Sequence, residues 1–293
     1  MHAVESNQMA SRTSHMHTVP AAYLRPFADT SVHLRNPHIW RFERQTAQAK
    51  LIGIRDVSVS RDIYTLRNKN GEVDTTIEKE LLGETVENPL PAVIQSLTSG
   101  GRPTYWQWRS VFVFMSFQLA RKSRMFQSIG DEGNRLGIDI GPNDPQLLMV
   151  HSAPFLEKWL CGMEWLLDWN RSTLPLLTSD NPVVMWADRG EGAELGVGFQ
   201  DAKLRMLFLL TPGICITAVQ TEASLKCVHD DVPVSLPKDD DFYPICINPN
   251  SLGIEQAVKL NQVAVSNAEK YVYGNSKQEE VLFFLNDCFF GRS

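Results

Sequence analysis

Apolar side chains near the N-terminus recur at the spacing of a short helix, and they are Val19, Tyr23, Leu24 and Phe27. Pro20 suits the first helical turn because it lacks the N–H group that would be unpaired there, and Pro26 limits the helix. Residues 38–43 then alternate polar and apolar side chains, which is typical of a half-buried strand. Short strand candidates follow at 51–54 and 57–59, so this part of the chain predicts a small antiparallel unit.

The middle of the chain has longer apolar segments with helical periodicity. Residues 75–97 predict a helix that ends at the prolines 89 and 91, because proline interrupts the ladder of backbone hydrogen bonds. Residues 104–127 contain no Gly or Pro and are apolar on nearly every side at 111–117, which favours a buried central helix. A further amphipathic helix is expected to begin at Pro154 and to run past Leu167.

The second half of the chain predicts mainly strands. Residues 173–178 and 183–186 flank the turn 179–182, and residues 204–210 and 214–219 flank a second turn. Most positions of these strands are apolar, so we expect the sheet to be covered on both faces. The remaining elements expected are a strand at 244–248, a helix at 254–268 and a closing strand at 271–273.

These elements together predict an α+β fold, with a mixed, mostly antiparallel sheet and several packed helices in a single compact domain. We expect residues 1–14 to form a mobile N-terminal arm and residues 15–276 to form the domain. Residues 277–293 are expected to form a C-terminal helix or strap.

Composition narrows the class of protein. The net charge of −6 argues against a surface made for general binding to phosphate backbones, although a local basic cleft is compatible with it. The five cysteines are scattered and form no C-x-x-C pair, which favours a reducing compartment. The polar N-terminus lacks the apolar core of a secretory signal, and no apolar stretch is long enough to span a membrane. We therefore predict a cytoplasmic protein.

A few polar residues interrupt apolar surroundings and are candidate site residues. We select His17, Arg121 and Asp180 as candidate catalytic residues, and as candidate ligand-binding residues Arg25, Gln118, Asn181 and Asn261. Each has a structural alternative, since a cation at a helix C-terminus is favoured by the dipole and Asp or Asn often bonds its own turn. Arginine would bind a carboxylate or phosphate through its planar fork.

Two glutamates suggest a weak metal site. Glu80 and Glu84 lie four residues apart on the predicted helix 75–97, so their carboxylates could share a divalent cation such as Mg²⁺ or Mn²⁺. Such a row of carboxylates is more often a solvated helix face. The nucleophile elbow, the P-loop, the dinucleotide-binding glycine pattern and the H-E-x-x-H zinc motif are all absent from the sequence.

Four stretches together resemble a known family. They are His17-Thr18-Val19-Pro20-Ala21-Ala22-Tyr23-Leu24-Arg25-Pro26-Phe27-Ala28, Gln118 to Arg121, Ser179-Asp180-Asn181-Pro182, and Asn261 leading to Tyr271-Val272-Tyr273. In this order the chain is similar to a bacterial family that is named only as domain of unknown function 4238. The resemblance spans about residues 15 to 276 and implies one fold unit, with a site assembled from distant segments. It implies no particular activity.

Two hypotheses from different classes follow. The first is a metal-assisted phosphodiesterase or nuclease, with His17 as general acid or base, Asp180 as metal ligand or orienting carboxylate and Arg121 as phosphate clamp. Glu80 or Glu84 would supply a second carboxylate. The alternative is a non-catalytic module that senses a ligand or binds a protein, for example in a stress or defence locus. The expected partner is a small molecule or a nucleic acid.

Overall fold

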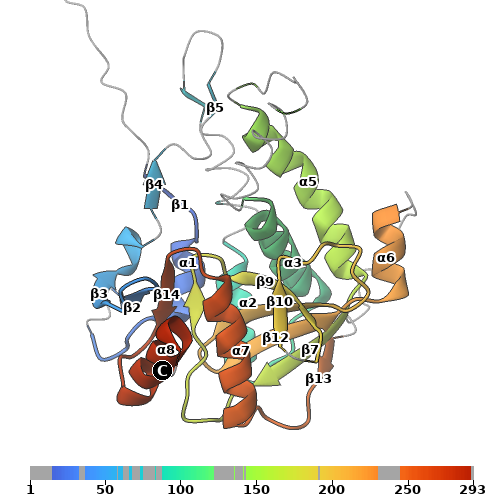
Figure 1. The fold of residues 1–293 in the computed structure, drawn as a ribbon. Helices are drawn as coiled ribbons and strands as arrows, with labels where there is room; N and C mark the ends of the chain where they lie inside the picture. The colour runs from blue at the N-terminus through green and yellow to red at the C-terminus, as the bar shows by residue number, and fades with distance from the viewer. Residues whose placement is uncertain are drawn as a thin grey trace, which may run out of the picture.

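Two large β-sheets, of six and of four strands, form the framework of the part of the chain that the structure describes (Figure 1). This computed structural model describes residues 15–32, 37–57, 59–61, 66–67, 73–74, 83, 88–121, 135, 141, 143–190, 192–229 and 245–291. The predicted α+β class with mostly antiparallel pairing is confirmed.

The six-stranded sheet is antiparallel except at one edge. In spatial order its strands are β10 (Ala193–Leu195), β9 (Val183–Asp188), β11 (Leu204–Thr211), β12 (Ile214–Val219), β7 (Glu164–Trp169) and β13 (Ile245–Ile247). The pair β13–β7 is parallel. β11 is buried at seven of its eight positions, so both faces of this strand are covered, as its continuous apolar run predicts.

The four-stranded sheet joins the two ends of the chain. Its spatial order is β3 (Ala49–Gly53), β2 (His38–Glu43), β14 (Tyr271–Gly274) and β8 (Thr178–Ser179). The predicted closing strand β14 is thus an internal strand that pairs with β2 on one side and β8 on the other. Two further strand pairs are β1 (His15–His17) with β4 (Val59–Arg61), and β5 (Leu66–Arg67) with β6 (Val73–Asp74).

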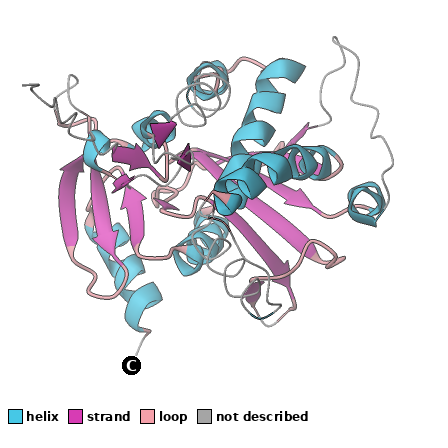
Figure 2. Cartoon of the chain, turned by 90° about the horizontal axis from the view of Figure 1, so that it is seen from above, coloured by secondary structure: helices cyan, strands magenta, loops and turns pink. Residues whose placement is uncertain are grey.

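Helices lie on both sides of the larger sheet, as Figure 2 shows. The helical elements are α1 (Ala21–Leu24), η1 (Arg25–Phe27), η2 (Ile54–Asp56), α2 (Leu90–Thr98), α3 (Tyr105–Ala120), α5 (Asp144–Cys161), α6 (Glu222–His229), α7 (Ile254–Asn267) and α8 (Glu279–Phe290). One face of the sheet packs on α3, where the rings of Phe112 and Trp165 are 4.9 Å apart. On the opposite side, α7 packs against β9 and β10. Within the described residues, no helix combines the length and the apolar character that crossing a membrane requires.

Tyr23 in α1 links the two sheets. Its hydroxyl donates to the carbonyl of Leu209 in β11 at 2.7 Å and lies 2.7 Å from the hydroxyl of Thr178 in β8. Its ring stacks on Phe208 at 5.2 Å and contacts Phe114 of α3 at 5.5 Å. Burial raises the pKa of the phenol far above its ordinary value, so Tyr23 stays protonated and able to donate. The opening helix is therefore a central connection of the fold.

Several predicted elements differ from those observed. The two strands that flank the turn 179–182 do not pair with each other, because β8 and β9 lie in different sheets. The helix expected from Pro154 begins earlier, at Asp144, and ends at Cys161, and residues 164–169 form a strand. Short apolar runs fit a helix and a buried strand equally well, and pairing with β12 decides for the strand. Pro89 precedes α2 and Pro91 lies in its first turn, where no backbone donor is needed, so a helix begins at these prolines. Residues 75–82 and 84–87 of the predicted helix lie outside the described residues.

Other predicted elements are confirmed. The β11–β12 hairpin, β13 and α7 form where the hydrophobic pattern places them. α3 begins with a capping box in which the Thr104 hydroxyl and the Gln107 backbone N–H are 3.3 Å apart. The expected N-terminal arm 1–14 lies outside the described residues.

Candidate functional site

Asp180 lies at the connection between α7 and β14. Its carboxylate accepts the backbone N–H groups of Glu269 at 2.8 Å, Lys270 at 2.7 Å and Tyr271 at 2.9 Å. Its own backbone N–H donates to the Tyr271 carbonyl at 3.1 Å. The side chain thus closes the turn before β14, which is the structural alternative that the sequence left open.

Asn181 and Asn267 extend this connection along α7. The Asn181 amide donates to the Asn267 carbonyl at 3.2 Å, and the Asn267 amide donates back to the Asn181 carbonyl at 2.9 Å. The Ser179 hydroxyl accepts the backbone N–H of Asn181 at 3.1 Å. This reciprocal pair joins the C-terminal end of α7 to the turn after β8.

Asn261 performs the same task in the middle of α7. It is fully buried, its Oδ1 accepts the backbone N–H of Leu177 at 2.8 Å, and its Nδ2 donates to the carbonyl of Pro175 at 2.9 Å. We call the side chains of Asp180, Asn181, Asn261 and Asn267 the latch. The latch holds α7 against the segment that leads into β8, with donors and acceptors matched.

The latch carboxylate has a perturbed acidity. Burial raises the pKa of the Asp180 carboxyl above its ordinary value, and the hydrogen bonds from the backbone of Tyr271, Lys270 and Glu269 offset only part of that rise. The three N–H groups occupy three of the roughly four lone-pair sites of this carboxylate, which leaves little capacity for a metal ion.

Gln118 and Arg121 lie at the C-terminal end of α3, each with only 4% of its surface exposed. The backbone N–H of Arg121 donates to the Phe117 carbonyl and caps the helix. The Nε2 atom of Gln118 has no hydrogen-bond partner among the described residues. Gln118 follows Phe114 by one helical turn, and Phe114 contacts Tyr23, so this polar end of α3 lies on the α1 side of the core.

The remaining predicted site residues are not brought together by the described structure. Arg25 is exposed in η1. The backbone of His17 pairs with Val59 in the β1–β4 ladder, while the side chain of His17 and both residues Glu80 and Glu84 lie outside what the structure describes. No group of three or more His, Cys, Asp or Glu side chains suited to a metal ion occurs among the described residues. The constellation of His17, Arg121 and Asp180 therefore stays a prediction.

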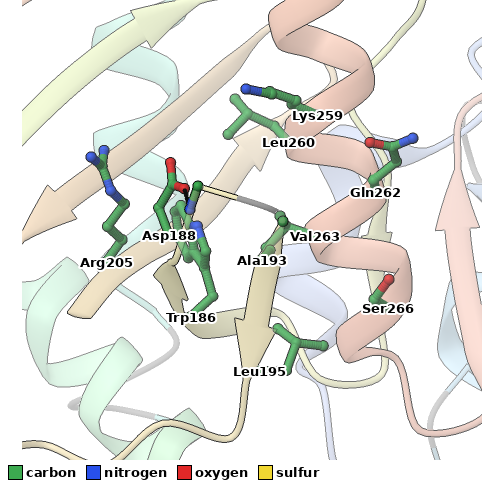
Figure 3. Close-up of a pocket in the computed structure, with 12 residues that line it drawn as sticks. Trp186, Asp188, Ala193, Leu195, Arg205, Lys259, Leu260, Gln262, Val263 and Ser266 are labelled. Carbon is green, nitrogen blue, oxygen red and sulfur yellow. Dashed lines mark hydrogen bonds between the residues drawn. The ribbon is translucent and has the colours of Figure 1, made fainter. Parts of the chain in front are cut away.

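A cavity of about 620 Å³ lies between α7 and the strands β9, β10 and β11. Sequence reasoning missed it. Its lining is Trp186, Asp188, Gly190, Gly192, Ala193, Leu195, Arg205, Lys259, Leu260, Gln262, Val263 and Ser266. Figure 3 shows the charged groups of Asp188, Arg205 and Lys259 toward one end of this cavity and the apolar side chains of Leu195 and Val263 toward the other. We call it the α7 cavity.

Charges in the α7 cavity come from separate elements. Lys259 belongs to α7 and Arg205 to β11, and neither side chain forms a hydrogen bond or ion pair within the described residues. Asp188 at the end of β9 accepts the backbone N–H of Gly190 at 3.0 Å. The β9–β10 wall is braced by Arg189, which binds Glu194 at 2.7 Å and also pairs with Asp201. Two cations from different elements therefore line one cavity.

The sequence holds only faint signals for this cavity. Arg205 is the single charged residue of the otherwise apolar strand β11, and Gly190 and Gly192 have φ angles of 86° and 147°, which side-chain-bearing residues rarely adopt. Lys259 is one of several charged residues on α7 and stands out only when its neighbours in space are known.

Comparisons with known proteins leave one informative result. Neither curated proteins nor solved structures gave a match. The family model described as "Protein of unknown function (DUF4238)" matches residues 16–136 and 131–278, which is most of the chain. The protein therefore belongs to the DUF4238 family.

Proposed function

We propose that this protein is a ligand-sensing module that binds an anionic small molecule in the α7 cavity. The observation that carries the proposal is the position of Arg205 and Lys259. The two cations come from different elements, line one cavity, and have no ionic partner among the described residues. A cation without an internal partner can form its ion pair with a ligand at no loss to the fold.

The wall chemistry specifies the kind of ligand. Arginine presents a planar fork that matches a carboxylate or a phosphate, and lysine adds a mobile point charge. The aromatic ring of Trp186 and the apolar side chains of Leu195 and Val263 offer a surface for an uncharged part of the ligand. A volume of about 620 Å³ is within the usual range for sites that hold small molecules.

A sensing role follows from the two elements involved. A ligand that binds both Lys259 and Arg205 would connect α7 directly to the six-stranded sheet. The latch already holds the opposite face of α7. The added connection would therefore reduce the motion of the helix without changing its position.

The test is a thermal unfolding screen of the full chain with inorganic phosphate, a nucleoside monophosphate and a dicarboxylate. At a ligand concentration about one hundred times Kd we expect about 2.7 kcal/mol of stabilisation from one of these anions. Lys259→Ala and Arg205→Ala should lose most of that effect. Lys50→Ala, which removes an exposed cation on β3, is the matched control and should keep it.

Two outcomes would refute the proposal. One is that no anion in the screen stabilises the wild-type protein. The other is that Lys259→Ala and Arg205→Ala are stabilised as strongly as Lys50→Ala.

A metal-assisted phosphodiesterase or nuclease is the second candidate. It is favoured by the buried Gln118, whose Nε2 donor is unsatisfied within the described residues and lies one turn from Arg121. In this candidate Arg121 binds the phosphate and His17 moves the proton, with Mg²⁺ or Mn²⁺ as the cofactor. The three backbone N–H groups that the Asp180 carboxylate already accepts weigh against it as a metal ligand.

Phosphodiesterase and nuclease assays with Mg²⁺ and with Mn²⁺ test this candidate. We expect wild-type turnover to fall by at least about a hundredfold in His17→Ala. Arg55→Ala, which removes an exposed cation of η2 that has no part in the proposed site, is the control for general disturbance of the N-terminal part of the chain. Equal activity in wild type and His17→Ala would exclude the role given to His17.

A further inference from the structure

A second cavity, of about 510 Å³, lies between α7 and α8 and differs in chemistry from the α7 cavity. It is lined by Thr173, Leu174, Ile254, Val258, Glu279, Glu280, Phe283, Phe284 and Asp287. We call it the α7–α8 groove. Its walls are two helices, and Leu174, from the loop after β7, also lines it.

The groove exposes large apolar side chains to water. Phe283 of α8 is 64% exposed and Ile254 of α7 is 49% exposed, whereas Phe284 beside them is buried in the core. Exposed apolar side chains that line one hollow, instead of being scattered singly, mark a surface that another molecule covers. Ile254 and Val258 are four residues apart on α7, so they present one continuous stripe.

The rim of the groove is acidic. Glu279 and Glu280 occupy the first turn of α8, where the helix dipole favours carboxylates. Asp287 lies in the last turn of α8, where the same dipole disfavours a negative charge. All three carboxylates line the groove, which surrounds its apolar surface with negative charge.

We infer that the α7–α8 groove docks an amphipathic helix of a partner protein, with lysine or arginine residues beside its apolar face. Groove-forming helix pairs bind such helices through apolar anchors at helical spacing. The acidic rim selects a basic partner by charge complementarity. A second copy of this chain is disfavoured as the occupant, because its groove would bring three further carboxylates against the first three. The inference does not depend on what binds in the α7 cavity.

The test uses a fluorescently labelled amphipathic peptide of Leu and Lys, about 18 residues long, and the full-length protein. We expect saturable binding in fluorescence anisotropy that weakens as salt is added. A Leu and Glu peptide of equal length should bind at least about tenfold more weakly.

Matched variants separate the groove from general attraction between a basic peptide and an acidic protein. Phe283→Ala should weaken binding about tenfold, while Phe290→Ala should leave it unchanged. Phe290 is the appropriate control because it is 60% exposed on the same helix and does not line the groove. Asp287→Lys should weaken binding of the Leu and Lys peptide, and Glu222→Lys on α6 should not.

Three outcomes would overturn the inference. The first is that the Leu and Lys peptide does not bind at all. The second is that Phe283→Ala and Phe290→Ala bind it equally, or that Asp287→Lys and Glu222→Lys do so. The third is that the wild-type protein self-associates in sedimentation velocity and Phe283→Ala abolishes the association, which would make a second copy the occupant.

Discussion

The polar side chains on the two sides of α7 differ in whether they form hydrogen bonds within the protein. On one side, Asn261 and Asn267 are committed to backbone groups of the segment around β8. On the other side, Lys259 lines a cavity and has no hydrogen bond or ion pair within the described residues. The two sides differ in hydrogen bonding: the latch side chains have partners for their donors and acceptors, whereas the Lys259 ammonium group on the cavity side has none among the described residues.

This contrast changes how the sequence motifs should be interpreted. A polar residue inside an apolar row is a candidate for chemistry, and Asn261 and Asp180 are both of this kind. Burying a polar group requires a hydrogen-bond partner, so such residues are also selected where backbone groups of irregular segments need one. The residues best placed to meet a ligand are exposed and ordinary in sequence.

The largest effect is expected from Asn261→Ala. The change leaves the Leu177 N–H and the Pro175 carbonyl buried without their partner, which should lower the free energy of unfolding by about 3 kcal/mol. Urea unfolding followed by circular dichroism measures it. Gln262→Ala, at the next position but exposed on the cavity side, is the control and should change stability by less than about 0.5 kcal/mol. A neutral Asn261→Ala would show that the latch does not hold α7.

Asp180→Ala should have the next largest effect. Three backbone N–H groups lose their acceptor, but Glu269 and Lys270 are exposed, so water can replace part of the loss. We expect a decrease of about 2 kcal/mol in the free energy of unfolding. Asp188→Ala removes a carboxylate that serves one backbone N–H in the α7 cavity, and it should cost clearly less. Equal decreases in the free energy of unfolding of the two variants would contradict the proposed difference between the latch and the α7 cavity.

The pH dependence of stability tests the cause of the perturbed Asp180 acidity. Because burial raises the pKa of this carboxyl in the folded state, the folded protein holds the proton to a higher pH than the unfolded chain does. Stability should therefore fall as pH rises from the ordinary value of 3.8 through the raised one. Urea unfolding between about pH 4 and pH 7 should show that the stability difference between wild type and Asp180→Asn has a downward slope. Other carboxyl groups with shifted pKa, such as Asp168, titrate in both proteins and cancel in this difference. An upward slope would mean that the three N–H bonds outweigh burial.

The smallest effect on stability is expected on the cavity side. Lys259→Ala removes an exposed side chain with no ionic partner among the described residues, so the free energy of unfolding should change by less than about 0.5 kcal/mol. The same variant should lose anion binding. A destabilisation as large as that of Asp180→Ala would instead show that Lys259 stabilises the fold.

Much of the fold follows from local pattern. Helix α7, the β11–β12 hairpin and strand β13 form where periodicity and turn residues indicate them, because their signals are carried by neighbouring residues. The errors lie where partners are distant. Whether residues 164–169 form helix or strand depends on β12 and β13, and β8 pairs with β14 more than 90 residues away. No local signal contains that information.

The candidate site divides in the same way. The sequence by itself determined the α+β class, the family and a set of polar positions that are out of place in their apolar rows. Only the tertiary structure decided which backbone groups Asp180 and Asn261 satisfy, and that Arg205 and Lys259 meet at one cavity. Burial and hydrogen bonding are properties of pairs of groups in space, and the partners of these residues lie tens of residues away along the chain. The sequence shows that a polar residue is present. Whether that residue has a hydrogen-bond partner depends on which groups the tertiary structure places next to it.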